Sequence, residues 1–224
     1  MAKGYKQQHG VDYEEVFAPV ARLEMVRLIL SLAAENKWKI FQMDVKSTFL
    51  NGSIEEEVYV QQPLNYVVKG EENKVLKLKK AFYGLKQAPR AWNCRIDRYF
   101  QENGFVKCPY GYALYIKVSI GGILIVCLYV DDLIFTGNNP RMFEEFKRAM
   151  SNEFEMTDMG LMSYYLDIEV KQMEEGIFIS QENYAREVLK KFNMSNCKPV
   201  NTLVACGIKL FKFEEGESVD ATLF

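Results

Sequence analysis

Two neighbouring aspartates, Asp131 and Asp132, follow a run of apolar residues that is typical of a buried strand. A third aspartate, Asp44, lies near the end of another short apolar run, 39–45. Adjacent carboxylates repel one another, and a divalent cation is the simplest group that offsets this repulsion. If the two strands are neighbours in one sheet, the three carboxylates converge on one site. Such a site would hold two Mg²⁺ ions about 4 Å apart and support in-line transfer of a nucleotide to a hydroxyl group.

The alternative is an acidic turn that simply faces solvent, because adjacent aspartates are common in turns. His9 is the only histidine, so histidine-based catalysis and histidine-ligated metals are nearly excluded. A metal-dependent hydrolase, which would need further ligands near the aspartate pair, is disfavoured for the same reason. The five cysteines are odd in number and include no CxxC pair. They indicate reduced thiols, not a disulfide framework or a zinc site.

The charge is unevenly distributed, although the net charge is only −2. Residues 74–90 contain no acid and six basic residues: Lys74, Lys77, Lys79, Lys80, Lys86 and Arg90. This pattern predicts a phosphate-facing surface, with a solvated basic face as the alternative. The first ten residues lack the apolar core of a secretory signal. The most apolar stretch, 123–135, is too short to span a bilayer and is expected to be sheet core.

Apolar periodicity predicts the elements that would position these residues. Helices are expected at 22–35, 91–102, 140–150 and 180–192, the last capped by Ser180. Strands are expected at 39–45, 112–118, 123–130 and 133–136, and a further hairpin at 164–170 and 177–179. This order predicts an α+β fold in which helices pack on one face of an antiparallel sheet.

Several blocks of the sequence resemble one known family. Residues 129–133 (YVDDL) resemble the YxDD box of reverse transcriptases. Residues 42–52 (QMDVKSTFLNG) and 83–92 (YGLKQAPRAW) are similar to segments of Ty1/copia-type retrotransposon polymerases. Shorter matches lie at 12–20 (DYEEVFAPV) and 154–160 (FEMTDMG). The similarity runs from Ala2 to about Leu210, in the family's order.

The resemblance implies the reverse transcriptase domain of a copia-type LTR retrotransposon, an RNA-directed DNA polymerase, over residues 1–210. In the right-hand fold of such polymerases, the fingers would comprise about 1–38 and 58–90. The palm would comprise about 39–57 and 91–179, with an antiparallel RRM-like sheet, and the thumb would begin in 180–224.

The resemblance also implies roles for single residues at the metal site. Asp44 and Asp131 would hold both metal ions, the backbone carbonyl of Val45 would be a further ligand, and Asp132 would support them. The ions would be two Mg²⁺, with Mn²⁺ as a substitute. Phe49 would be an aromatic steric gate beneath the incoming sugar, where a 2′-hydroxyl would clash, or alternatively a core aromatic.

The nucleotide pocket would be lined by residues of the 83–92 block together with Phe49: Tyr83, Gly84, Gln87 and Pro89. Glycine permits close approach of the backbone, and an aromatic ring can stack on a base. Lys86, Arg90 and Tyr129 would contact nucleic acid, with plain surface charge as the alternative for the two cations.

The implied partners are an RNA or DNA template with its primer, dNTPs, and the integrase and RNase H regions of a Pol polyprotein, with no membrane. The location would be cytoplasmic, in a virus-like particle, or nuclear. The sequence departs from the family pattern at Asp167, where glycine is usual, and at Leu203, where proline is usual. With the short flanks, these departures indicate a truncated copy that is weak or inactive alone. The alternative is a catalytically dead, domesticated nucleic-acid-binding remnant.

Overall fold

The computed structural model of the chain describes residues 2–17 and 21–199. The chain divides into two compact units, Met1–Ser163 with Lys171–Phe178 and Tyr164–Val170 with Ile179–Phe224. Leu203, the end of the predicted thumb and residues 18–20 of the 12–20 block lie outside the described residues. No helix in the described ranges is long and apolar enough to cross a membrane.

A six-stranded antiparallel sheet forms the centre of the larger unit, with the strand order β4-β5-β6-β7-β1-β8. Its strands are β1 (Ile40–Val45), β4 (Val106–Lys107), β5 (Leu114–Ser119), β6 (Gly122–Tyr129), β7 (Asp132–Gly137) and β8 (Met156–Leu161). The predicted antiparallel sheet is therefore confirmed. Strand β8 was not predicted, because its sequence MTDMGL contains an aspartate and a glycine, which are depleted in strands.

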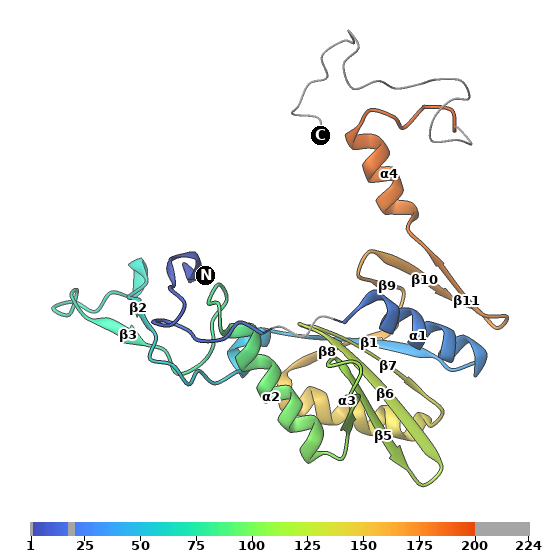
Figure 1. Cartoon of the computed structure of the whole chain (residues 1–224), viewed down its shortest axis with the longest axis horizontal. Coiled ribbons are helices and arrows are strands. Elements are labelled where there is room, and N and C mark those ends of the chain that lie inside the picture. Colours follow the sequence, from blue (N-terminus) through green and yellow to red (C-terminus); the bar gives the residue numbers. More distant parts are fainter. Residues whose placement is uncertain (1, 18–20, 200–224) are drawn as a thin grey trace. The chain divides into compact units, whose positions relative to one another are not determined.

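Helices α2 (Ala88–Glu102) and α3 (Pro140–Phe154) cover one face of this sheet (Figure 1). Because side chains alternate along a strand, every second residue faces these helices. Met43 and Val45 of β1, and Leu133 of β7, belong to the apolar core that results. Asp44, between Met43 and Val45, and Asp132, directly before Leu133, therefore face the opposite side of the sheet.

Helix α1 (Leu23–Glu35) lies against that opposite face. Near its start, Arg22 and Met25 line the same cavity as Leu114 and Cys127. Along their own strands, Leu114 is next to Tyr115, and Cys127 is between Val126 and Leu128. These adjacent residues belong to the core under α2 and α3, so Leu114 and Cys127 point away from it. The expectation that the helices pack on one face is therefore wrong for α1. An amphipathic stripe identifies which side of a helix is buried but not the layer that it meets.

Local chemistry explains where α2 and α3 begin. Pro140 occupies the first turn of α3, and the side chain of Asn139 accepts a 3.0 Å hydrogen bond from the N–H of Arg141. This is an ordinary N-cap, which satisfies a donor that the helix leaves free. Helix α2 begins at Ala88, earlier than predicted, because Pro89 is compatible with the first turn of a helix.

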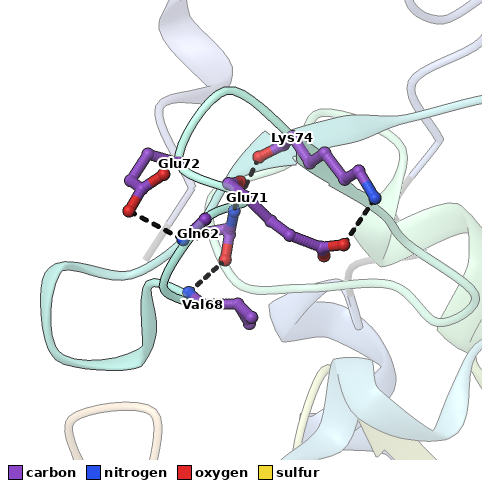
Figure 2. Close-up of polar contacts among 6 residues, drawn as sticks. Gln62, Val68, Glu71, Glu72 and Lys74 are labelled. Carbon is purple, nitrogen blue, oxygen red and sulfur yellow. Dashed lines mark hydrogen bonds and ion pairs between the residues drawn. The ribbon is translucent and has the colours of Figure 1, made fainter.

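A separate two-stranded antiparallel ribbon consists of β2 (Tyr59–Gln61) and β3 (Val75–Lys77). Three short 3-10 helices complete this part of the chain: η1 (Gly4–Lys6), η2 (Thr48–Asn51) and η3 (Leu64–Tyr66). The side chain of Gln62 organises the loop between β2 and β3 (Figure 2). Its Nε2 donates to the carbonyls of Glu71 at 2.7 Å and Lys74 at 2.9 Å, and its Oε1 accepts from the N–H of Val68 at 2.9 Å.

A three-stranded sheet precedes the last helix, with the strand order β11-β10-β9. Its elements are β9 (Tyr164–Tyr165), β10 (Ile168–Gln172) and β11 (Ile177–Ser180), and α4 (Glu182–Lys191) follows them. The predicted strand 164–170 is interrupted, because Leu166 and Asp167 have φ angles of 49° and 62° and form a tight turn. The predicted Ser180 cap is also wrong. The N-cap of α4 is Gln181, whose side chain makes no capping hydrogen bond.

Candidate active site

The two acidic strand ends lie side by side, because β1 and β7 are neighbours in the sheet and Asp44 is paired with Asp132. Residues that face each other in this way have Cβ atoms about 4.5–5.5 Å apart. Asp131 lies in the turn just before β7, and its carbonyl accepts a 2.9 Å hydrogen bond from the N–H of Val45. The condition on which the predicted convergence depended, that the two acidic strands are neighbours, is therefore met.

The three carboxyl groups affect one another electrostatically. Partial burial raises the pKa of Asp44, the charge of Asp131 raises it further, and the charge of Lys46 lowers it. Burial also raises the pKa of Asp132, and so do the charges of Asp131 and Asp44. A 3.1 Å hydrogen bond from Nε2 of Gln42 to Oδ1 of Asp132 acts in the opposite direction. A bound cation would relieve this repulsion.

No three His, Cys, Asp or Glu side chains among the described residues are grouped closely enough to hold a metal by themselves. This is compatible with Mg²⁺, which proteins usually bind through one or two carboxylates together with substrate phosphates. The carbonyl of Val45 already accepts a 2.9 Å hydrogen bond from Oγ1 of Thr48. A carbonyl oxygen has two lone pairs, so this bond orients the group and leaves it able to bind a cation.

The turn that carries Asp131 is anchored to helix α2. Val130 has a φ of 53°, in the left-handed region that β-branched residues rarely adopt. Its carbonyl accepts a 2.7 Å hydrogen bond from Nε1 of Trp92. Trp92 is buried and packs edge-on against Phe154, with ring centroids 5.3 Å apart. Trp92 was recognised only as the end of the 83–92 block, and no pattern in the sequence indicated this contact.

Phe49 and Tyr83 form an aromatic pair beside the acidic strand ends. Phe49 is on η2, five residues after Asp44. It is half-buried, and its ring centroid lies 4.5 Å from that of Tyr83. It packs both against the core of the sheet and against a smaller cluster that contains Leu85. A half-buried ring fits either a steric gate or a core aromatic, so the gate stays a prediction.

Two further residues of the predicted pocket lie at the start of α2. Pro89 is in the first turn and is half-buried. Gln87 has no exposed surface, and its amide is bonded within the chain. Its Oε1 accepts a 3.0 Å hydrogen bond from Nε2 of Gln7, and its Nε2 donates to the carbonyl of Asp12 at 3.2 Å. Gly84 is exposed and has a φ of 98°. Direct contact of these residues with a nucleotide stays a prediction.

Ion pairs divide the basic stretch 74–90 into two groups. Three of its cations are paired: Lys74 with Glu71 (Figure 2), Lys77 with Glu57, and Arg90 with Glu56. Three others are exposed and make no ion pair with any residue of the described ranges: Lys79, Lys80 and Lys86. Among the residues predicted to contact nucleic acid, Lys86 is therefore available for phosphate, whereas Arg90 would first have to leave Glu56.

A cavity of about 260 Å³ lies on the same face of the sheet as the strand aspartates. Its lining includes three aromatic rings, an arginine and an apolar floor: Phe17, Tyr110, Tyr112, Arg22, Leu114 and Cys127. Cys127 and Tyr129 lie on the same face of β6, and Tyr129 pairs with Asp132. Cys127, which lines the cavity, therefore lies two residues, about 7 Å along the strand, from the residue that pairs with Asp132. Burial raises the pKa of the Cys127 thiol to about 12. Like Cys127, the other three described cysteines are unpaired, as predicted.

The fold and the site define an α+β domain whose antiparallel sheet presents three aspartates at one end. Comparison with known proteins identifies the family. The sequence model of the family described as "Reverse transcriptase (RNA-dependent DNA polymerase)" matches residues 1–205. The chain belongs to this family.

The relatives show which branch of the family this is. The Retrovirus-related Pol polyprotein from transposon TNT 1-94 of Nicotiana tabacum is 38% identical over 215 residues, 95% of this chain and 16% of that protein. The corresponding polyprotein from transposon RE1 of Arabidopsis thaliana is 37% identical over 222 residues, 99% of this chain and 15% of that protein. A putative transposon Ty5-1 protein of Saccharomyces cerevisiae is 28% identical over 181 residues, 80% of this chain and 59% of that protein.

These relatives confirm the predicted copia-type resemblance. The chain spans about a sixth of the length of the two plant polyproteins. No solved structure matched the chain significantly.

Proposed function

We propose that this chain carries the nucleotidyl-transfer site of an RNA-directed DNA polymerase, with Asp44, Asp131 and Asp132 as the metal-binding carboxylates. The observation that carries the proposal is the pairing of Asp44 with Asp132 on neighbouring strands, with Asp131 in the adjoining turn. In this proposal the six-stranded sheet with α2 and α3 is an RRM-like palm. The β2–β3 ribbon and the N-terminal segment belong to the fingers, and α4 begins the thumb.

The residues of the chain would orient the metal ligands. Two Mg²⁺ ions, or Mn²⁺ in their place, would when bound supply activation of the primer 3′-hydroxyl and stabilisation of the leaving pyrophosphate. Asp44 and Asp131 would hold them, together with the Val45 carbonyl that Thr48 orients. Asp132, which Gln42 holds by a hydrogen bond, would complete the negative charge of the site.

The surroundings of the carboxylates suit a nucleotide and a nucleic acid strand. The exposed Lys79, Lys80 and Lys86 would meet phosphates of the dNTP, the primer or the template. The aromatic rings and the arginine that line the 260 Å³ cavity suit an unstacked template base. Phe49, packed on Tyr83, would lie beneath the sugar and exclude a 2′-hydroxyl.

Primer extension on poly(rA)/oligo(dT) with Mg²⁺ or Mn²⁺ tests this proposal. We expect extension by the parent chain and its loss in Asp131→Asn. The matched control is Glu102→Gln, which removes an exposed carboxylate at the end of α2. Equal extension by Asp131→Asn and the parent would rule out the proposed site.

The gate is tested by the choice of sugar. Phe49→Ala should incorporate UTP more readily relative to dTTP than the parent does, while use of dTTP is partly retained. If the two proteins discriminate equally, Phe49 is a core aromatic.

The alternative function is nucleic-acid binding without catalysis, and Asp167 is the observation that favours it. A carboxylate stands there at a glycine-type backbone angle, in a hairpin that the family resemblance would place beside the primer strand. Salt-dependent binding of poly(rA)/oligo(dT) without extension under either metal would favour this alternative.

A further inference from the structure

We propose that Gln7 is a positioning residue for the nucleotide pocket, because its amide fixes the 83–87 loop that places Tyr83 against Phe49. The hydrogen bonds of the Gln7 amide to Lys86 and Gln87, called the clamp below, can be measured without any activity. Its effect on nucleotide choice rests on the proposed function.

The N-terminal segment lies directly on the 83–87 loop. The N–H of Ala2 donates a 2.7 Å hydrogen bond to the carbonyl of Tyr83. Gly4 is buried against Gly84, and a Cβ atom on Gly4 would come within 1.7 Å of the Gly84 carbonyl oxygen. Only glycine permits this approach of the two backbones. The segment and the loop are therefore in contact at two points before Gln7.

Gln7 then binds the loop through both ends of its amide. Its Oε1 accepts a 2.9 Å hydrogen bond from the N–H of Lys86. Its Nε2 donates a 3.0 Å hydrogen bond to Oε1 of Gln87. Gln87 in turn donates to the carbonyl of Asp12 at 3.2 Å, which returns to the N-terminal segment. One glutamine therefore fixes a main-chain group and a buried side chain of the loop at the same time.

The chemistry of this contact favours glutamine at position 7. A carboxylate could accept from Lys86 but could not donate to Gln87, and its charge would face the Gln87 oxygen. An apolar side chain of similar length would leave the buried Gln87 oxygen without its donor, and such a loss costs more than the hydrogen bond contributes when formed.

The clamp acts on two parts of the proposed pocket, the Tyr83–Phe49 pair and the start of α2. The N-terminal segment holds the loop at Tyr83, whose own carbonyl accepts from Ala2, and again three and four residues later at the Gln7 contacts. The ring of Tyr83 packs on Phe49 with the centroids 4.5 Å apart. Gln87 also accepts the 3.0 Å hydrogen bond from the N–H of Ala91 that starts α2. A shift of about 1 Å in a group that positions a substrate can change a rate by about a hundredfold. The discrimination between sugars therefore depends on Gln7, which itself contacts no nucleotide in this proposal.

The first test measures the clamp without any activity. Hydrogen exchange of the Lys86 amide is compared in four forms of the 224-residue chain: the parent, Gln7→Met, Gln7→Glu and the matched control Gln8→Met. Gln8 is exposed, and its side chain makes no hydrogen bond within the described residues; its main-chain N–H donates to the carboxylate of Asp12. We expect Lys86 to exchange about five- to tenfold faster in Gln7→Met. It should exchange near the parent rate in Gln7→Glu and Gln8→Met, with the α3 amides unchanged throughout. Unchanged exchange of Lys86 in Gln7→Met would overturn the proposal, whatever the chain catalyses.

The second test measures the consequence for the nucleotide. Binding of Mg·dTTP and Mg·UTP to the same four proteins is followed by calorimetric titration. We expect the preference for dTTP over UTP to fall severalfold in Gln7→Met and Gln7→Glu and to persist in Gln8→Met. If the parent prefers dTTP over UTP and Gln7→Met shows the same preference, the positioning role is overturned. A parent that binds neither nucleotide would overturn the proposed function, and the exchange data would then show whether the clamp exists without it.

Discussion

Trp92 of helix α2 donates a 2.7 Å hydrogen bond from its indole Nε1 to the main-chain carbonyl of Val130. Val130 is the residue with the left-handed φ of 53° in the turn between β6 and β7, directly before the aspartate pair. The bond therefore restrains a strained peptide unit next to Asp131. The helix that packs under the sheet also fixes the orientation of the acidic turn on the sheet's end.

Replacing Trp92 by phenylalanine should destabilise the fold by about 2–3 kcal/mol, because the partly buried Val130 carbonyl loses its donor and part of the volume of the buried ring is lost. Urea unfolding measures this change. Trp38→Phe is the matched control. Trp38 is half-buried, and its indole makes no hydrogen bond in the described structure, so less than about 1 kcal/mol is expected. Equal losses in the two variants would show that the Val130 bond contributes little.

Gly52 is the contact point between η2, which carries Phe49, and helix α2. A Cβ atom at position 52 would lie 2.7 Å from the main-chain carbon of Ala91 and 2.7 Å from the nitrogen of Trp92. Backbone atoms cannot yield easily, so Gly52→Ala should destabilise the fold by about 1–3 kcal/mol in urea unfolding.

Gly111→Ala is the matched control for this substitution. A Cβ atom there would meet the flexible tip of Met25 at 2.8 Å. Because that side chain can move aside, the loss should stay below about 1 kcal/mol. The interpretation fails if Gly111→Ala is as costly as Gly52→Ala.

The sequence predicted the residues of the site better than their surroundings. Short apolar runs rich in β-branched and aromatic residues located β1, β6 and β7, and the motifs placed an aspartate at the correct ends. The pairing of Asp44 with Asp132 was predicted only on the condition that β1 and β7 are neighbours, because strand order depends on contacts between distant segments. The same holds for α1, whose sheet face could not be read from its amphipathic pattern.

The contacts that hold the predicted pocket were not predictable from local patterns. Gln7 and Gln87 are eighty residues apart, and no spacing rule connects them. The 83–92 block indicated Gln87 as a nucleotide contact, whereas the structure shows its amide bonded within the chain. The interruption of the predicted strand at Leu166 and Asp167 was missed because neither residue is a glycine.

Removing one carboxylate from the acidic cluster should stabilise the metal-free fold at neutral pH. The pKa of Asp44 is raised in the folded chain by burial and by the charge of Asp131. The folded state therefore binds a proton more tightly than the unfolded state. The cost of its charge is fully present above the folded pKa, declines as pH falls through that pKa, and is absent below the unfolded value near 3.9.

Asp44→Asn should therefore raise the melting temperature at pH 7 and give no gain at about pH 3. Mg²⁺ should stabilise the parent more than the variant, since the parent has the greater charge to neutralise. Thermal unfolding at both pH values, with and without Mg²⁺, measures this. An Asp44→Asn variant that is less stable than the parent at pH 7 would contradict the electrostatic account.

Asp167 combines two properties that substitution can separate. Its φ of 62° is one that glycine adopts freely and asparagine more easily than most residues, and its carboxylate accepts a 2.7 Å hydrogen bond from the hydroxyl of Tyr164. Asp167→Gly should relieve the backbone angle and stabilise the β9–β10 turn by up to about 1 kcal/mol in urea unfolding. Asp167→Asn should change stability little, while it removes the charge. If that charge repels primer phosphates, both variants should bind poly(rA)/oligo(dT) more tightly than the parent, and the difference should shrink as salt rises. Tighter binding by Asp167→Gly alone would assign the effect to the backbone angle instead, and unchanged binding by both would separate this hairpin from the primer.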